Sequence, residues 1–182
     1  MFSSKTANIS LEELVRQYRE HDYTPGIYSD NRATAYGRRI YGKIVETLSS
    51  TVIRKYEPII QEMELSFLIS DCFDYDLSGT VSIWLAGTNN RPLVKFEICL
   101  NIDKFNDEYI NTISEKLSTE IDKRLEPAFT KWAAAMAEYY AQMQARYAWT
   151  DYTKCLANAH LIIRTCPLPA EQFLSYDIVV LD

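Results

Sequence analysis

The chain has 182 residues, of which 47% are hydrophobic and 24% are charged. These proportions are those of a globular domain and exclude an intrinsically disordered chain. A core of this size is stable without a disulfide or a metal, so we expect one domain over residues 1–182. Nineteen Lys and Arg against 25 Asp and Glu give a net charge of −6. This excludes a protein that coats nucleic acid or anionic membrane with its whole surface, and leaves room for a local basic patch.

The sequence gives no sign of targeting to a membrane or of export. Residues 1–8 are polar, and no apolar run of signal-peptide length follows them. The apolar stretches are shorter than the ~18 residues of a membrane-spanning helix and are interrupted by charges such as Lys95. We therefore predict a cytoplasmic protein that does not bind membranes.

The four cysteines, Cys72, Cys99, Cys155 and Cys166, are not arranged in CxxC pairs, and this spacing does not fit a zinc site. Their apolar neighbours favour reduced thiols buried in the core. A disulfide between Cys72 and Cys99 on two strands is the alternative.

The first third of the chain predicts helices. Ser10 and Glu13 form a capping box, which indicates a helix over residues 11–21. From Thr34 onward, apolar residues recur every four positions. This pattern predicts a long helix that stops or kinks at Pro58.

The middle of the chain predicts strands, because β-forming residues dominate three stretches with turn formers between them. These stretches are 65–75, 80–86 and 93–102. Since the intervening turns are short, we expect the three strands to pair in sequence as an antiparallel meander.

The remainder of the chain predicts a long helical region followed by strands. Asn106 is a helix N-cap followed by two acidic residues. Helical spacing of apolar residues continues on both sides of Pro127, which indicates two consecutive helices or one kinked helix. Residues 161–165 and 176–181 are typical of late strands. We therefore predict an α+β fold in which the meander, extended by one or two late strands, packs against long helices on one face.

Basic residues concentrate in the predicted long helix. Residues 32–56 hold six of them against one acid, Glu46. At about 100° per residue, four of the six fall within an arc of roughly 60°. We call these four the basic ridge: Arg32, Arg39, Lys43 and Arg54. Such a ridge can bind phosphates or an acidic protein surface, whereas pairing of Lys43 with Glu46 on a solvated helix face is the simpler interpretation.

Tyrosine is unusually frequent, with 13 residues against seven Phe and three Trp. Tyr139 and Tyr140 are adjacent on a predicted helix, so they cannot both face one core. Trp132 and Met136 lie on the same helix. Because aromatic and methionine side chains are enriched in protein interfaces, this region is a candidate docking surface. A helix that simply packs in the core is the alternative.

Acidic residues near the predicted strand ends allow a metal-binding hypothesis. Asp74 and Asp76 resemble the start of a calcium loop, but the position of the required Glu is Leu85. Asp71, Asp74, Asp76 and Glu97 could instead hold Mg²⁺ for phosphodiester cleavage. The order helix, three strands, helix is similar to that of the restriction-endonuclease-like core. That family has an acid, any residue and then Lys on the third strand, and the order here is the reverse, Lys95-Phe96-Glu97.

The sequence contains no complete catalytic, metal-binding or nucleotide-binding motif. We therefore expect a non-catalytic module for protein interaction or assembly, which needs no cofactor and acts on a protein partner or by self-association. Small acidic chains of this kind are common among phage-encoded structural proteins and inhibitors of host factors, in the host cytoplasm or the virion. The alternative is a nucleic-acid-binding protein that uses the basic ridge, or a metal-dependent nuclease.

Overall fold

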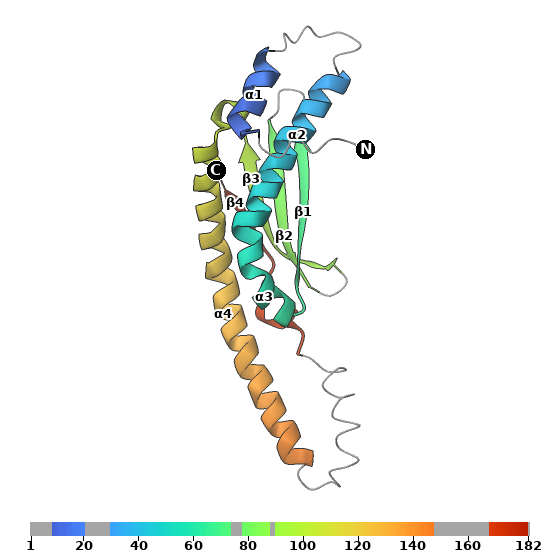
Figure 1. The fold of residues 1–182 in the computed structure, drawn as a ribbon. Helices are drawn as coiled ribbons and strands as arrows, with labels where there is room; N and C mark the ends of the chain where they lie inside the picture. Colours follow the sequence, from blue (N-terminus) through green and yellow to red (C-terminus); the bar gives the residue numbers. More distant parts are fainter. Residues whose placement is uncertain (1–8, 21–29, 74–77, 88–89, 148–167, 182) are drawn as a thin grey trace.

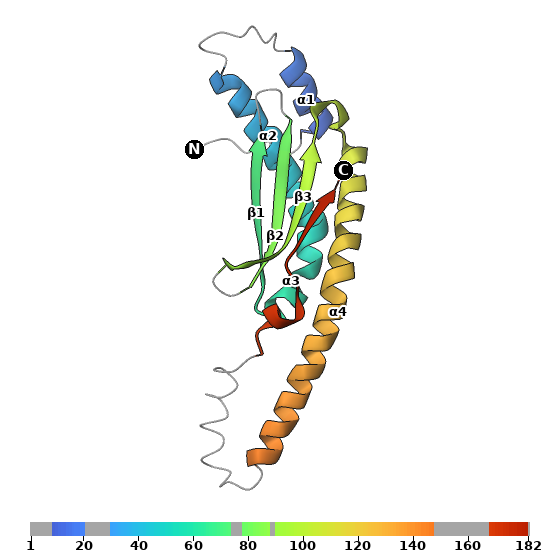
Figure 2. The same cartoon turned by 180° about the vertical axis from the view of Figure 1, so that it is seen from behind.

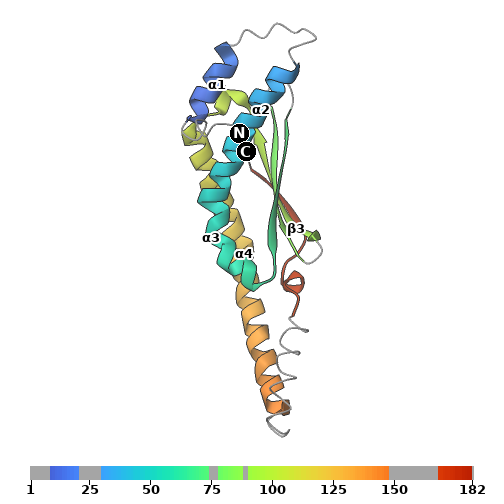
Figure 3. The same cartoon turned by 45° about the vertical axis from the view of Figure 1, so that its right-hand side comes forward.

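The computed structural model describes residues 9–20, 30–73, 78–87, 90–147 and 168–181. They form two layers, which are a four-stranded sheet and a layer of helices that covers one of its faces (Figures 1 and 3). The predicted α+β fold, with strands packed against long helices on one face, is confirmed.

Helix α1 (Leu11–Glu20) begins at the predicted N-cap. The Glu13 amide donates a hydrogen bond of 3.1 Å to the hydroxyl oxygen of Ser10, which satisfies one of the amides that the first turn leaves unpaired. The buried face of α1, with Leu14 and Val15, contacts α2.

The second helical segment is a continuous column of α2 (Asp30–Leu48), the π-helical segment η2 (Ser49–Ile53) and α3 (Arg54–Glu62). Its buried residues recur every four positions from Ile40 to Ile60. A period of four is wider than the 3.6 residues of an α-helical turn and narrower than a π-helical turn. The π-helical segment in the middle therefore keeps this apolar stripe turned towards the core.

Two prolines lie inside helices without ending them. Pro58 lies in α3, which continues to Glu62. The helix therefore does not stop at Pro58, which was one of the two predicted alternatives. Pro127 lies in α4 (Asp107–Tyr147), so of the two predicted alternatives a single helix through Pro127 is confirmed and two consecutive helices are wrong. Both prolines are exposed, so water can reach the carbonyl groups that they leave unpaired. Helix α4 is gently curved and about 60 Å long (Figure 2).

The sheet contains the predicted meander of β1 (Ser66–Phe73), β2 (Gly79–Ala86) and β3 (Pro92–Leu100), all antiparallel. Strand β4 (Asp177–Leu181) pairs in parallel with β3, which gives the order β1-β2-β3-β4. The late strand predicted at the C-terminal end is therefore confirmed, and the one predicted at 161–165 lies outside the described residues. Because parallel neighbours need a crossover between them, α4 forms part of the connection from β3 to β4.

The core lies between the two layers. Alternate residues of the strands supply one side of it, and a stripe of α4 supplies the other: Val81, Ile83 and Leu85, Val94, Phe96 and Ile98, and Ile113, Leu117, Ile121 and Leu125. Tyr41 of α2 is fully buried, with its ring stacked on Phe73 at 4.7 Å between centroids and edge-on to Phe105 at 6.1 Å. These aromatic contacts hold α2 against the end of β1.

Candidate functional site

One face of the sheet is covered by helices, and no described helix covers the other (Figures 2 and 3). Successive strand residues point to opposite faces, so the pairing register shows which residues share the uncovered one. We call these eleven residues the open sheet face: Leu68, Ser70 and Cys72 of β1, Thr80, Ser82 and Trp84 of β2, Lys95, Glu97 and Cys99 of β3, and Ile178 and Val180 of β4.

The open sheet face exposes large aliphatic side chains. Leu68 is 38% exposed on β1, and Ile178 and Val180 are 48% and 54% exposed on β4. Tyr176, just before β4, is 65% exposed. The outer face of a solvated antiparallel sheet normally carries polar side chains. Tyr176, Ile178 and Val180 lie together at β4, and contiguous apolar exposure of this kind marks an interaction surface more often than a solvated one.

The two charged residues of this face neutralise each other. Lys95 Nζ forms an ion pair with Glu97 Oε1, and only 21% and 29% of the two side chains are exposed. Lys95 Nζ also lies 5.0 Å from the centre of the Trp84 ring, in a cation–π contact. The open sheet face therefore has no net charge, in a chain whose net charge is −6.

Trp84 has an unsatisfied polar atom. Its Nε1 is buried, and no described residue accepts a hydrogen bond from it. A buried N–H without an acceptor costs about 1–3 kcal/mol. Buried N–H groups in native proteins nearly always have an acceptor. The Trp84 indole therefore carries an energetic cost among the described residues.

For the two cysteines that the structure describes, the predicted reduced state is confirmed and the predicted burial in the core is wrong. Cys72 and Cys99 are exposed free thiols rather than core residues. Both lie opposite Thr80, which places one strand between them. Two strand spacings separate their Cα atoms by about 10 Å, whereas a disulfide spans no more than about 7 Å. The alternative disulfide is therefore excluded in this register. Cys155 and Cys166 lie outside the described residues.

Strand β4 is held to the helical layer by an ion-pair network. Arg124 of α4 donates from Nε and Nη2 to Asp177 Oδ2, at 3.0 and 2.7 Å, and from Nη1 to Glu120 Oε2 at 2.6 Å. Hydrogen bonds from Lys123 and Arg124 lower the pKa of Glu120, so this carboxylate stays ionised as a partner for Arg124. The network fixes the start of β4 and with it the position of Ile178.

The aromatic residues predicted as a docking surface lie on α4 as expected, in two different environments. Trp132 is buried, and its Nε1 donates to the carbonyl oxygen of Leu168 at 3.0 Å. Tyr140 is 36% exposed, and its ring meets that of Tyr139 edge-on at 5.7 Å. Trp132, Met136 and Tyr140 line one wall of a groove of about 620 Å³. The end of α3 and the segment at η5 (Ala170–Phe173) supply the other walls.

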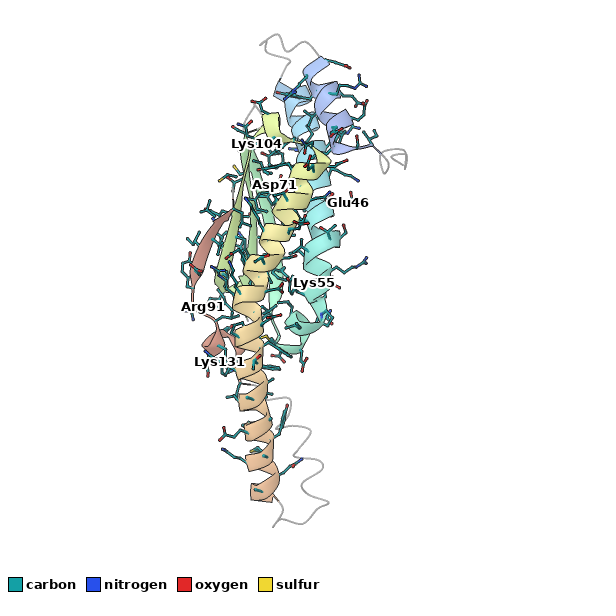
Figure 4. The ribbon with its side chains drawn as sticks, turned by 90° about the vertical axis from the view of Figure 1, so that its left-hand side faces the viewer. Glu46, Lys55, Asp71, Arg91, Lys104 and Lys131 are labelled. Atoms are coloured by element: carbon teal, nitrogen blue, oxygen red, sulfur yellow. The ribbon has the colours of Figure 1, made fainter. Side chains whose placement is uncertain are left out.

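The basic ridge requires an advance of about 100° per residue along one regular α-helix. The π-helical segment η2 interrupts this regular helix between Lys43 and Arg54. Arg39 is exposed, and Lys43 lies 3.8 Å from Glu46, which is the pairing that the simpler interpretation predicts. Arg54 follows the π-helical segment, whose wider turns advance less than 100° per residue and rotate it relative to Arg39. Arg32 lies in α2, and its side chain is outside the described part. Figure 4 shows Glu46 projecting from α2 on the side away from the sheet.

The acidic residues considered as metal ligands are not brought together in the described part of the chain. Asp74 and Asp76 lie outside it, and Glu97 is on the open sheet face. Asp71 pairs with Val81, so it lies on the opposite face of the sheet from Glu97. Among the described residues, no three His, Cys, Asp or Glu side chains are placed to hold a metal ion.

The sequence analysis missed Leu68, Trp84, Ile178 and Val180 as candidate site residues. A signal for two of them is present, because residues 178–181 are apolar at every position. A strand that is apolar on both faces is typical of one that is covered on both faces. For Leu68 and Trp84 no local signal exists, since only the register places them in the same row across the sheet as Ile178.

No family model, curated protein sequence or solved structure matches this chain. Within the described residues, no helix combines the length and the apolar character needed to cross a membrane.

Proposed function

We propose that this protein is a non-catalytic protein-interaction module and that the open sheet face is its docking surface. The observation that carries the proposal is the exposure of Ile178 and Val180 together on β4, and of Leu68 on the opposite edge strand, on a sheet face that no described helix covers. Burying apolar surface gains about 25 cal/mol per Å². A protein partner that covers these side chains removes their apolar surface from water, and this free energy stabilises the complex.

The polar residues of the face are compatible with burial. Ser70, Thr80 and Ser82 carry short hydroxyl groups, which a partner can pair at low cost in side-chain entropy. The charges of Lys95 and Glu97 are already paired. Apolar and aromatic residues with little free charge are typical of the buried centre of protein interfaces.

The outer surface of the helices has a different character. On α1, Arg16 pairs with Glu13 and Glu20, and on α2 Lys43 pairs with Glu46. Exposed pairs of this kind are typical of solvated helices and contribute little to binding. The open sheet face therefore supports an interaction function better than the outer side of these two helices does.

Site-specific photocrosslinking in the cells that naturally produce the chain tests this proposal. A photoreactive phenylalanine derivative replaces Ile178, and the matched control places it at the exposed Lys131 of α4. We expect a crosslinked product of defined mass from position 178 that is lost when Val180→Glu is added. Because Val180 is half exposed, this second change should leave the circular dichroism spectrum unaltered. Equal and diffuse labelling from both positions, unaffected by Val180→Glu, would show that the open sheet face is not a docking surface.

A further inference from the structure

The residues of the open sheet face are arranged so that they complement themselves, and this makes the proposed docking function more specific. We propose that the occupant of the open sheet face is a second copy of this chain, docked sheet to sheet about a two-fold axis. This inference depends on the proposed function only in using the same surface. The charge, the side-chain register and the area of the open sheet face all fit such a dimer.

A two-fold interface presents the same patch from both sides, so a patch with net charge repels itself. The chain as a whole carries −6, whereas Lys95 and Glu97 leave the open sheet face neutral. These two residues lie two positions apart on β3, about 6.6 Å along the strand. A two-fold axis that lies in the interface and crosses β3 between them sets each Lys95 opposite Glu97 of the partner subunit.

The same axis pairs the other residues of the face. The register aligns Leu68, Trp84, Lys95 and Ile178 in one row and Ser70, Ser82, Glu97 and Val180 in the next. An axis between the two rows lays the first row of one copy over the second row of the other. Ile178 then packs against the partner's Val180. The ring of Trp84 then lies over the partner's Ser82.

This arrangement uses the ordinary geometry of stacked sheets. The strands of the two copies run antiparallel across the interface, and twisted sheets pack with their strands within about 30° of each other. The helices of each copy cover its other face (Figure 3), so the dimer has four layers with the two sheets in the middle. Every exposed aliphatic residue of the open sheet face becomes covered.

The area of the sheet limits the size of the dimer interface. Four strands at a spacing of about 4.8 Å and eight residues at about 3.3 Å each give an outline of roughly 19 Å by 26 Å. Two such faces enclose at most ~1,000 Å², which is the small end of specific interfaces. We therefore expect a reversible dimer that dissociates on dilution within the range of ~1 μM to ~1 mM.

Charge exchange tests the two-fold pairing directly. A Lys95→Glu copy carries two acids at this site, and a Glu97→Lys copy carries two bases, so each variant should dimerise about tenfold or more weakly than the wild type. An equimolar mixture of the two variants should dimerise again, because each acid pair then faces a base pair. Sedimentation velocity at protein concentrations from ~1 μM to ~1 mM measures the fraction of dimer in each variant and in the mixture. Lys131→Glu and Glu46→Lys, on the helical layer, are the matched controls and should leave dimerisation unchanged.

The exposed thiols provide a second measurement that needs no variant. Cys72 and Cys99 lie on the open sheet face, in the row next to that of Glu97, and a second copy would cover them. Both thiols should therefore react more slowly with iodoacetamide when the protein is at ~1 mM than when it is at ~1 μM. A wild type that stays monomeric throughout, with concentration-independent labelling, would overturn the dimer. So would a dimer in which mixing restores nothing and the thiols stay reactive, because its interface lies elsewhere. A foreign protein crosslinked at position 178 to a monomeric chain would overturn the second copy and leave the docking function standing.

Discussion

Tyr56 links the helical column to α4 in the middle of the protein. The residue is 3% exposed, and its hydroxyl oxygen lies 2.7 Å from Asp122 Oδ1 and 3.0 Å from the carbonyl oxygen of Ser118. Lys55 Nζ donates to the same hydroxyl at 3.3 Å and lies 3.5 Å from Asp122 Oδ2. Replacing Tyr56 by Phe removes the hydroxyl group from this network and keeps the ring in the core.

The size of the effect follows from the partners. A hydrogen bond to a charged group contributes about 1.5–3 kcal/mol. The Asp122 side chain is 35% exposed and keeps Lys55 as a partner, so water and Lys55 recover part of what is lost. We expect Tyr56→Phe to lower the free energy of unfolding at pH 7 by about 1 kcal/mol. In a chain of this length, that lowers the melting temperature by about 2–4 °C.

The pH dependence gives a sharper test. Burial, and after it the hydrogen bond with Asp122, raises the pKa of Tyr56 above its ordinary value of 10.0. The unfolded chain therefore loses the phenol proton at a lower pH than the folded chain does. The stability that this group contributes is complete below about pH 10 and is lost as the pH rises through the folded pKa. The free-energy difference between the wild type and Tyr56→Phe should be constant at neutral pH and should shrink above about pH 10.

Urea unfolding followed by circular dichroism at about pH 7, 9 and 11 measures this difference. Tyr176→Phe, at a residue that is 65% exposed, is the matched control and should unfold as the wild type does at pH 7. If Tyr56→Phe is as stable as the wild type at pH 7, the hydrogen-bond argument is refuted. If the difference is present but keeps its size up to about pH 11, the argument from the pKa is refuted.

Three further predictions concern the fold. Leu117→Ala, at a fully buried position of α4, should lower the free energy of unfolding by about 3–4 kcal/mol in urea titration, because it leaves a cavity in the core. Arg124→Gln should cost about 1 kcal/mol and speed amide hydrogen exchange in β4, because the partly exposed Asp177 loses its ion-pair partner. An added Cβ at Gly42 meets no atom within 4 Å, whereas one at Gly79 collides with the backbone of β1. Gly42→Ala should therefore raise the melting temperature by the equivalent of about 0.5–1 kcal/mol, and Gly79→Ala should lower it.

Features that depend on neighbours in sequence could be predicted from the sequence. The caps at Ser10 and Asn106 are both present, and Asn106 Oδ1 accepts a hydrogen bond from the amide of Tyr109 at 2.7 Å. The three strands of the meander pair in the predicted order, because short turns leave each strand only one neighbour within reach. Trp132 and Tyr140 were also correctly predicted on one helix, because helical spacing of apolar residues is a local pattern.

Other features could not be predicted because they depend on which surface meets which. The spacing of four in the helical column fits a bent or a widened helix, and only packing against the sheet selects the π-helical η2. Pro58 and Pro127 look like helix breaks in the sequence, but each lies on the solvent side, where its lost hydrogen bond costs little. Cys72 and Cys99 were predicted in the core because apolar neighbours in sequence do not show which face of a strand the helices cover.

The sequence by itself determined the elements, their order and the two faces of each strand, since these depend on local hydrogen bonding and on the alternation of side chains. Only the tertiary structure decided which face of the sheet the helices cover and that β4 joins β3 in parallel. That pairing brings Ile178 and Val180 beside Lys95 and Glu97, which lie about 80 residues earlier in the chain. The open sheet face exists because contacts over such separations are set by the packing of the whole core, which no local pattern encodes.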